Sequence, residues 1–134
     1  MKILFICHAN VCRSQMAEGI FNNISDIKSI SAGTDPGEWK GRKIGLTNFI
    51  ATSMKEKGIN IDNNVSKKIN KKMFEDADKV IVMVDKNNLP NYMKNSKKLI
   101  FWKVEDPCDS DINLVRKVRD EIKNKVEQLI KELK

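Results

Sequence analysis

The sequence predicts an α/β fold: a single domain over residues 1–134, with a doubly wound, four-stranded parallel sheet and helices on both faces. The first observation is that short apolar segments alternate with longer segments of helical pattern, as successive β-α units require. The second is the continuous apolar run 79–84, which suits a central parallel strand buried on both faces. The third is the length, because 134 residues can bury a hydrophobic core and are typical of one domain.

Each expected element follows from its local pattern. Strands are expected over four apolar, β-branched segments: 2–6, 28–32, 79–84 and 98–102. Helices are expected over about 14–22, 43–57, 70–75 and 111–133. The second of these helices is closed by Gly58. The last helix carries an apolar stripe at helical spacing, made of Val115, Val118, Ile122, Val126, Leu129 and Leu133.

Composition and charge exclude several classes of partner. No apolar run approaches the roughly 20 residues that span a bilayer, and no charged-then-apolar leader opens the chain. We therefore expect a cytoplasmic protein with no membrane partner. The net charge is +7, but the basic residues are scattered and aromatic residues make up 6%, so no nucleic-acid partner is expected. The positive charge instead favours the arrival of anionic substrates.

The three cysteines, Cys7, Cys12 and Cys108, raise the question of a reactive thiol. Their odd number and the absence of a leader argue against a disulfide scaffold. No pair has CxxC spacing and His8 is the only histidine, so a structural zinc site is not expected. The sequence thus predicts neither a metal nor a cofactor.

The main functional signal lies between the first strand and the first helix, where the chain reads Cys7-His8-Ala9-Asn10-Val11-Cys12-Arg13-Ser14. Successive backbone N–H groups in such a loop, at a helix N-terminus, bind a tetrahedral oxyanion. Arg13 can hold two oxygens of that anion. Cys7 would face the anion from the strand end, as a thiolate and in-line nucleophile. Ser14 can donate a hydrogen bond to the thiolate, and Asn10 tolerates a left-handed backbone in a tight loop.

A cysteine that attacks phosphorus needs an acid to protonate the leaving oxygen. Asp106 lies just past the fourth expected strand, at the same sheet edge as the loop. Pro107 biases the preceding residue towards an extended backbone, which holds the carboxylate steadily. Asp106 is therefore the expected acid, with Glu105 as the fallback.

Three motifs together resemble the low-molecular-weight protein tyrosine phosphatase superfamily, which also contains the thioredoxin-coupled arsenate reductases. They are Cys7-x5-Arg13-Ser14, Ser31-Ala32-Gly33-Thr34 and Asp106-Pro107, in the right order on the right elements, and the resemblance covers essentially the whole chain. It implies that Cys7 forms a phosphocysteine and that Arg13 binds the phosphoryl oxygens. Asp106 then protonates the leaving group and later activates water.

The resemblance also implies roles for the surrounding residues. The loop binds phosphate through His8, Ala9, Asn10, Val11, Cys12, Arg13 and Ser14. A hydrogen-bond network of Asn10, Ser14 and Ser31 shapes the loop, and Trp39 stands at an aromatic wall position. Cys12 can form a reversible disulfide with Cys7, which stops the nucleophile from further oxidation.

Features of both branches of the superfamily are present. Gln15 follows Ser14 at a position where phosphatases usually carry proline, and in this respect the chain resembles the reductases. The reductase relay needs two more cysteines at the end of the third strand and after it, and residues 82–89 contain none. We therefore expect a phosphomonoester hydrolase that acts on a phosphorylated protein or a small phosphate ester, with phosphate, vanadate and arsenate as oxyanion ligands.

Two alternatives remain open. One is an arsenate reductase that uses Cys7 with Cys12, Cys108 or an external thiol as the electron relay. The other is a non-catalytic anion sensor, which would not require both Cys7 and Asp106.

Overall fold

The strands form one parallel sheet in the computed structural model, which describes residues 1–47, 49–108 and 110–134. The strands β1 (Lys2–Cys7), β2 (Lys28–Gly33), β3 (Lys79–Val82) and β4 (Leu99–Phe101) lie in the order β2-β1-β3-β4. The predicted α/β class and four-stranded parallel sheet are confirmed.

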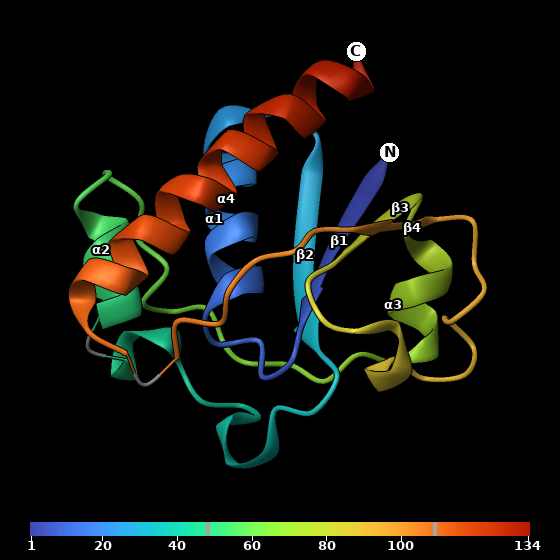
Figure 1. The fold of residues 1–134 in the computed structure, drawn as a ribbon, viewed down its shortest axis with the longest axis horizontal. Helices are drawn as coiled ribbons and strands as arrows, with labels where there is room; N and C mark the ends of the chain where they lie inside the picture. The colour runs from blue at the N-terminus through green and yellow to red at the C-terminus, as the bar shows by residue number, and fades with distance from the viewer. Residues whose placement is uncertain (48, 109) are drawn as a thin grey trace.

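The helices cover both faces of this sheet, as predicted. They are α1 (Arg13–Ile24), α2 (Phe49–Lys55), α3 (Lys71–Asp76) and α4 (Ile112–Leu133), joined by the 3₁₀ turns η1 (Gly37–Trp39), η2 (Ile44–Leu46) and η3 (Lys86–Asn88). Figure 1 shows α1, α2 and α4 on one side of the sheet and α3 on the other.

Alternation along β1 divides the core into two clusters, because successive side chains of a strand point to opposite faces. Ile3 and Phe5 pack with the apolar residues of α1 and α4. Leu4 and Ile6 join the other cluster, which includes Phe74 of α3. The stripe of α4 is buried as expected from Val115 to Leu129, and Leu133 is partly buried.

The helix expected over 43–57 is shorter in the structure. Its first residues form η2 instead, since the Ile44 N–H donates to the Asn64 carbonyl and the Gly45 N–H to the Asp62 carbonyl. These long-range bonds replace the local helical ones, and the described part of α2 begins at Phe49.

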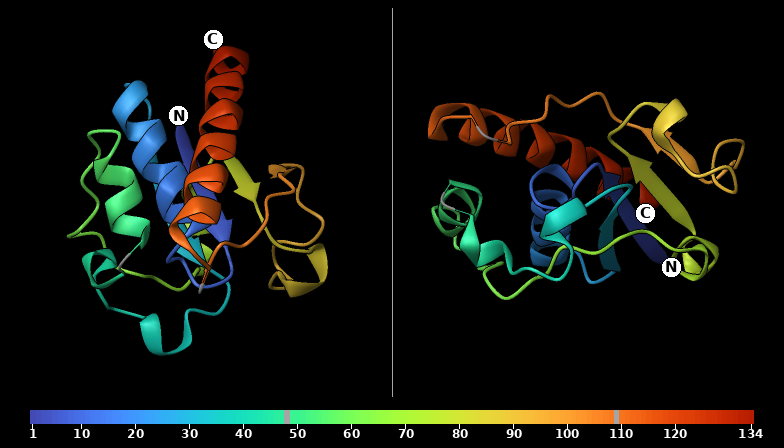
Figure 2. Two further views of the ribbon diagram at one scale, coloured as in Figure 1. Left: turned by 60° about the vertical axis from the view of Figure 1, so that its left-hand side comes forward. Right: turned by 90° about the horizontal axis from the view of Figure 1, so that it is seen from below.

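All four strands end at the same edge of the sheet, so the segments that follow them lie near one another (Figure 2). This edge carries residues 8–12, the segment after β2, residues 83–85 after β3 and residues 102–110 after β4, apart from residue 109. Of the helices described, none is long and apolar enough to cross a membrane.

Glu56, just after α2, ties this helix to α4. It accepts hydrogen bonds from Arg116 (2.6 Å from Nη2) and from Arg119 (2.8 Å from Nη1). These bonds lower the pKa of Glu56 from 4.5 to about 2. A lowered pKa in the folded state means that the charged carboxylate stabilises the fold above pH 4.5, and that this stability is lost as the pH falls towards 2.

We therefore expect the Glu56→Gln variant to have a lower free energy of unfolding than the wild type at pH 7. The difference should shrink as the pH falls from 4.5 towards 2 and vanish below that pKa, where the wild-type carboxyl becomes neutral in the folded state as well. Urea unfolding of both proteins across this range measures it. A difference that stays constant with pH would contradict the ion-pair explanation.

Candidate active site

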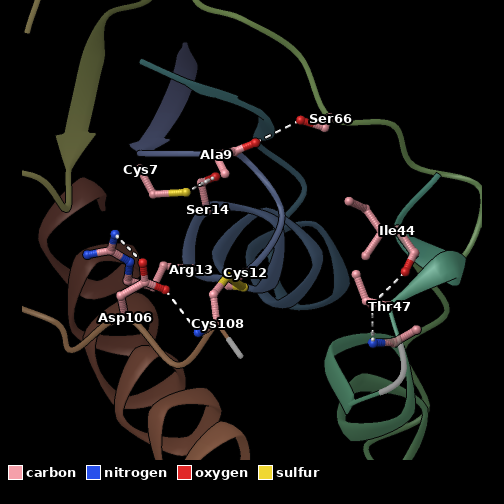
Figure 3. Close-up of a disulfide and its surroundings, with 11 residues drawn as sticks. Cys7, Ala9, Cys12, Arg13, Ser14, Ile44, Thr47, Ser66, Asp106 and Cys108 are labelled. Carbon is pink, nitrogen blue, oxygen red and sulfur yellow. Dashed lines mark hydrogen bonds and ion pairs between the residues drawn. A yellow bond between two sulfur atoms is a disulfide. The ribbon is translucent and has the colours of Figure 1, made fainter. Parts of the chain in front are cut away.

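Cys7 is the last residue of β1, and its thiol lies beneath the loop that leads into α1. The side chain is 2% exposed, and its Sγ is 2.9 Å from the Ser14 Oγ (Figure 3). Cys7 keeps a free thiol. The strand end and the first turn of α1 thus place a hydroxyl group directly against the expected nucleophile.

Asn10 organises the loop from a left-handed backbone conformation with φ of 57°. Its Oδ1 accepts from the Lys67 backbone N–H at 2.9 Å, which directs its amide nitrogen to the other side. That nitrogen donates to Ser14 Oγ at 2.8 Å and to Ser31 Oγ at 2.9 Å. Because Ser14 Oγ already accepts a hydrogen bond, its own proton is free to be donated to the Cys7 sulfur. The arrangement therefore places a hydrogen-bond donor against the Cys7 sulfur.

A second layer of polar side chains supports Asn10. Ser31 donates to the Glu18 carboxylate at 3.0 Å, and the Asn64 amide donates to the other oxygen of Glu18 at 3.1 Å. Burial raises the pKa of the Glu18 carboxyl, while the charge of Lys67 and the Ser31 hydrogen bond act in the opposite direction. The network expected for Asn10, Ser14 and Ser31 is thus present and extends to residues 18 and 64.

Arg13, the first residue of α1, has its side chain fixed by two backbone carbonyls. Its Nη1 donates to Met83 O at 2.5 Å and to Val104 O at 3.1 Å, after β3 and β4 respectively. The guanidinium is therefore held at the sheet edge. Its buried Nε has no hydrogen-bond partner in the described part of the chain.

The loop that follows Cys7 carries a series of unpaired backbone donors. The backbone N–H groups of residues 9–13 donate to no acceptor among residues 1–47, 49–108 and 110–134. Buried backbone donors are normally paired, so an unpaired series at a helix N-terminus indicates an anion site. Together with the guanidinium of Arg13, these groups are suited to a tetrahedral oxyanion.

Asp106 lies at the edge of this site, on the segment after β4. Its Oδ2 is 3.6 Å from Arg13 Nη2, and its Oδ1 accepts from the Cys108 N–H at 3.0 Å (Figure 3). The carboxyl side chain is 47% exposed, so it can reach a bound ester and water. Asp106 lines a hollow beside the loop, which also contains Trp39. The fallback candidate, Glu105, is exposed and does not line this hollow.

The cysteine pairing in the structure is not the reversible Cys7–Cys12 disulfide that the family resemblance implies can form. Cys12 is bonded to Cys108, with 6.3 Å between their Cα atoms, and Cys7 is free. The physical reason is that Cys7 lies under the loop against Ser14, whereas Cys12 precedes α1 where the segment after β4 passes. The bond therefore joins the loop of residues 8–12 to the segment that carries Asp106.

These same residues form the one group in the described chain with the spacing of a metal site. The ligand atoms of Cys12, Asp106 and Cys108 lie within 4.8 Å of one another. Metals bind cysteine as a thiolate, and both sulfurs are consumed by the disulfide. The residues in this oxidation state do not fit a metal ion.

Two hollows flank the loop. One, of about 570 Å³, has an apolar wall of Trp39, Leu46 and Phe49 and reaches Cys12 and Asp106. The other, of about 800 Å³, lies on the far side of Arg13 and includes two lysines, Lys86 and Lys103. His8 is exposed and lines both, while the buried loop residues Val11 and Cys12 line only the first. Trp39 and Asp106 thus line the same hollow, and the role of Trp39 as an aromatic wall for the substrate stays a prediction.

The amino-acid sequence matches the model of a known family. The family model described as low molecular weight phosphotyrosine protein phosphatase matches residues 2–134. The chain belongs to this family.

Proteins similar to this chain are named either as arsenate reductases or as phosphatases. Arsenate reductase 2 of Staphylococcus haemolyticus is 35% identical over 129 residues, which cover 93% of this chain and 92% of the relative. A low molecular weight protein tyrosine phosphatase from T. tengcongensis has a TM-score of 0.88 at 28% identity, covering 98% of this chain and 99% of the other. An arginine phosphatase from Geobacillus stearothermophilus has a TM-score of 0.86 at 25% identity, covering 98% and 92%. The family is enzymatic and includes both activities.

Sequence reasoning missed the segment 65–68, which lines the back of the phosphatase-family loop. Ser66 donates to the Ala9 carbonyl at 2.7 Å, and Lys67 supplies the backbone N–H that orients Asn10. Nothing in the local pattern of this polar stretch marks it as part of the site. The structure connects this segment to the site through Gln15, a fully buried polar residue that donates to Asn10 Oδ1 and to the Val65 carbonyl.

Gly33, at the end of β2, permits the close approach of the loop. A Cβ atom there would lie 2.5 Å from the His8 carbonyl oxygen and 2.8 Å from the Asn10 nitrogen. Both are backbone atoms, so the loop itself must move. We expect Gly33→Ala to lower stability by about 1–3 kcal/mol and to reduce kcat/KM by roughly tenfold or more through displaced oxyanion donors.

Gly19→Ala provides the matched control. Its added methyl group meets the side-chain ends of Ile61 and Met54, at 3.0 and 3.1 Å, and lies in a helix where alanine is preferred. Urea unfolding and initial rates compare the two variants. Equal rates for Gly33→Ala and the wild type would contradict the close-approach explanation.

Proposed function

We propose that this protein hydrolyses phosphate monoesters through a phosphocysteine at Cys7. The observation that carries the proposal is the free Cys7 thiol beneath unpaired N–H groups and the unpartnered Nε of Arg13, with a carboxyl group beside them. These groups supply a nucleophile, charge stabilisation at the phosphoryl oxygens and an acid for the leaving group.

The reaction has two steps. The Cys7 thiolate attacks phosphorus, the bond to the ester oxygen breaks, and Asp106 gives its proton to that oxygen. Water then attacks the phosphocysteine while Asp106 takes a proton from it, and inorganic phosphate leaves with the thiolate restored. Arg13 and the loop N–H groups hold the equatorial oxygens in both steps.

The apolar wall of Trp39, Leu46 and Phe49 beside Asp106 favours an aromatic or otherwise apolar leaving group. A phosphorylated protein side chain or a small aryl phosphate meets this requirement. Phosphate, vanadate and arsenate are expected to compete for the same loop. We place this activity in the cytoplasm.

The role of Asp106 predicts a dependence on the leaving group. Asp106→Asn should slow hydrolysis of phenyl phosphate by ~10²-fold or more, because phenolate is a poor leaving group that needs a proton. Hydrolysis of 4-nitrophenyl phosphate should fall much less, since 4-nitrophenolate leaves readily without one. Initial rates on both esters measure the difference. An equal loss on both would contradict the acid role.

Arsenate reduction is the second candidate, favoured by the Cys12–Cys108 disulfide and by the arsenate reductases among the relatives. In this scheme the chain starts fully reduced, and Cys7 attacks arsenate with loss of water. Cys12 attacks the Cys7 sulfur, two electrons pass to arsenic, and arsenite leaves with a Cys7–Cys12 disulfide formed. Cys108 then attacks Cys12, which frees Cys7 and leaves the observed bond for an external dithiol to reduce.

One preparation can separate the two candidates. Release of 4-nitrophenol and reduction of arsenate by thioredoxin or glutathione systems are measured side by side. Ester hydrolysis without arsenate turnover supports the phosphatase. Arsenate turnover that vanishes in Cys108→Ser would favour the reductase instead.

A further inference from the structure

We propose that the Cys12–Cys108 disulfide holds Asp106 over the phosphate loop, so that oxidation of this pair speeds the hydrolysis of esters with poor leaving groups. The inference rests on the proposed phosphatase function. Cys12 and Cys108 act here as positioning residues, since neither sulfur takes part in the reaction with phosphorus.

The geometry connects the disulfide directly to the acid. Asp106 is two residues before Cys108, on a segment where residues 102–107 form no helix or strand. The Cys108 N–H donates to Asp106 Oδ1 at 3.0 Å, so the bridged residue itself orients the carboxyl group. Cys12 is buried at the start of α1, so it provides a fixed point in the loop (Figure 3).

Asp106 is also linked directly to the start of α1 by its ion pair with Arg13, at 3.6 Å. This pair is half-exposed on the Asp106 side, and such pairs contribute little in water. The ion pair also weakens when substrate is bound and Asp106 acts as the acid. A bound phosphoryl group attracts the Arg13 guanidinium, and Asp106 must be protonated, and hence uncharged, to act as the acid. The disulfide is independent of both changes.

The expected effect is selective because an acid matters in proportion to the basicity of the leaving oxygen. General acid catalysis contributes about 10²–10⁴-fold, and a displacement of about 1 Å can cost ~10²-fold. Release of Asp106 from the loop should therefore impair phenyl phosphate hydrolysis strongly and 4-nitrophenyl phosphate hydrolysis weakly.

The redox step involves only the cysteine pair. An external dithiol cleaves the S–S bond, gives two electrons and two protons to the sulfurs of Cys12 and Cys108, and becomes a cyclic disulfide. Oxidation by a small-molecule disulfide reverses it, as two thiols are released from the oxidant. Cys7 takes no part in this exchange. Oxidation of the Cys12–Cys108 pair should therefore raise the rate of hydrolysis, whereas direct oxidation of the Cys7 nucleophile would stop it.

The test compares wild-type protein in two states, defined by thiol titration of the denatured chain. The oxidised state has one free thiol and the dithiothreitol-reduced state has three, since the chain has three cysteines. Reduction should slow phenyl phosphate hydrolysis by at least ~10-fold and 4-nitrophenyl phosphate hydrolysis by no more than ~2-fold. Cys108→Ser should match the reduced wild type in both conditions.

Asp106→Asn provides the decisive control, because oxidation should have no effect on either ester once the acid is absent. Far-UV circular dichroism and urea unfolding at the assay temperature establish that each species is folded. Equal rates for both wild-type states would overturn the inference, as would an equal loss on both esters or a redox effect that persists in Asp106→Asn. Absence of hydrolysis of either ester in both states would overturn the proposed function itself.

Discussion

Replacing Cys7 with serine is expected to abolish phosphate ester hydrolysis while the protein still folds and binds phosphate. The hydroxyl group occupies nearly the same buried space, but it is a much weaker nucleophile without a base to activate it. Loss of a covalent nucleophile lowers turnover by about 10⁴-fold or more. Initial rates with 4-nitrophenyl phosphate and calorimetric titration with phosphate measure the two properties.

Alkylation provides an independent check on Cys7. In the oxidised wild type Cys7 is the free cysteine, so iodoacetamide should label this residue alone and inactivate the enzyme. Bound phosphate should protect it. Residual hydrolysis in Cys7→Ser at the wild-type rate would exclude the phosphocysteine mechanism.

Arg13→Lys is expected to have the next largest effect, a loss of ~10²–10³-fold in kcat/KM, by analogy with removal of a charge-stabilising donor. The guanidinium is held through Nη1 by the carbonyls of Met83 and Val104, Nη2 lies 3.6 Å from Asp106, and the buried Nε has no partner in the described part of the chain. A lysine ammonium cannot contact both carbonyls and two phosphoryl oxygens from one position. Vanadate inhibition should weaken in parallel with turnover.

The matched control is Arg116→Lys, which alters a half-buried arginine that pairs with Glu56 away from the loop. It should leave kcat/KM within about twofold, since distant sites act independently. An Arg13→Lys enzyme as active as this control would show that the guanidinium does not hold the transferred group.

The fold was largely predictable because its signals are local. The continuous apolar run that became β3, and the helical stripe of α4, each report burial within a few residues of sequence. The start of α2 was predicted wrongly because the bonds of Ile44 and Gly45 are made with the segment 62–64, which no local pattern reveals. Long-range hydrogen bonding replaced a helical preference there.

The site was predictable in part for the same reason. Cys7, Asn10, Arg13 and Ser14 fall within one loop, so their proximity follows from the chain itself. Asp106 was predictable because the ends of parallel strands share an edge. The support from Ser66 and Lys67 was not, since these residues lie in a segment without regular pattern and act mainly through backbone geometry.

The disulfide shows most clearly what could not be predicted from the sequence. Cys12 is 96 residues from Cys108, and sequence spacing alone does not say which two of three thiols meet. The family resemblance implied only that the nearer pair, Cys7 and Cys12, can form a reversible disulfide. The fold instead places Cys7 against Ser14 and brings the segment after β4 to Cys12.

The same bond also has a consequence for the denatured protein. It closes a covalent ring that contains α1, β2, α2, α3, β3 and β4, with a separation of 96 residues between the bonded positions. In the chain-entropy model a crosslink of this length disfavours the unfolded ensemble by about 4–5 kcal/mol. The ring also keeps that ensemble compact, which lowers the denaturant dependence of unfolding. The oxidised chain thus unfolds into a covalent ring with two linear tails, which are the segments that form β1 and α4 in the folded protein.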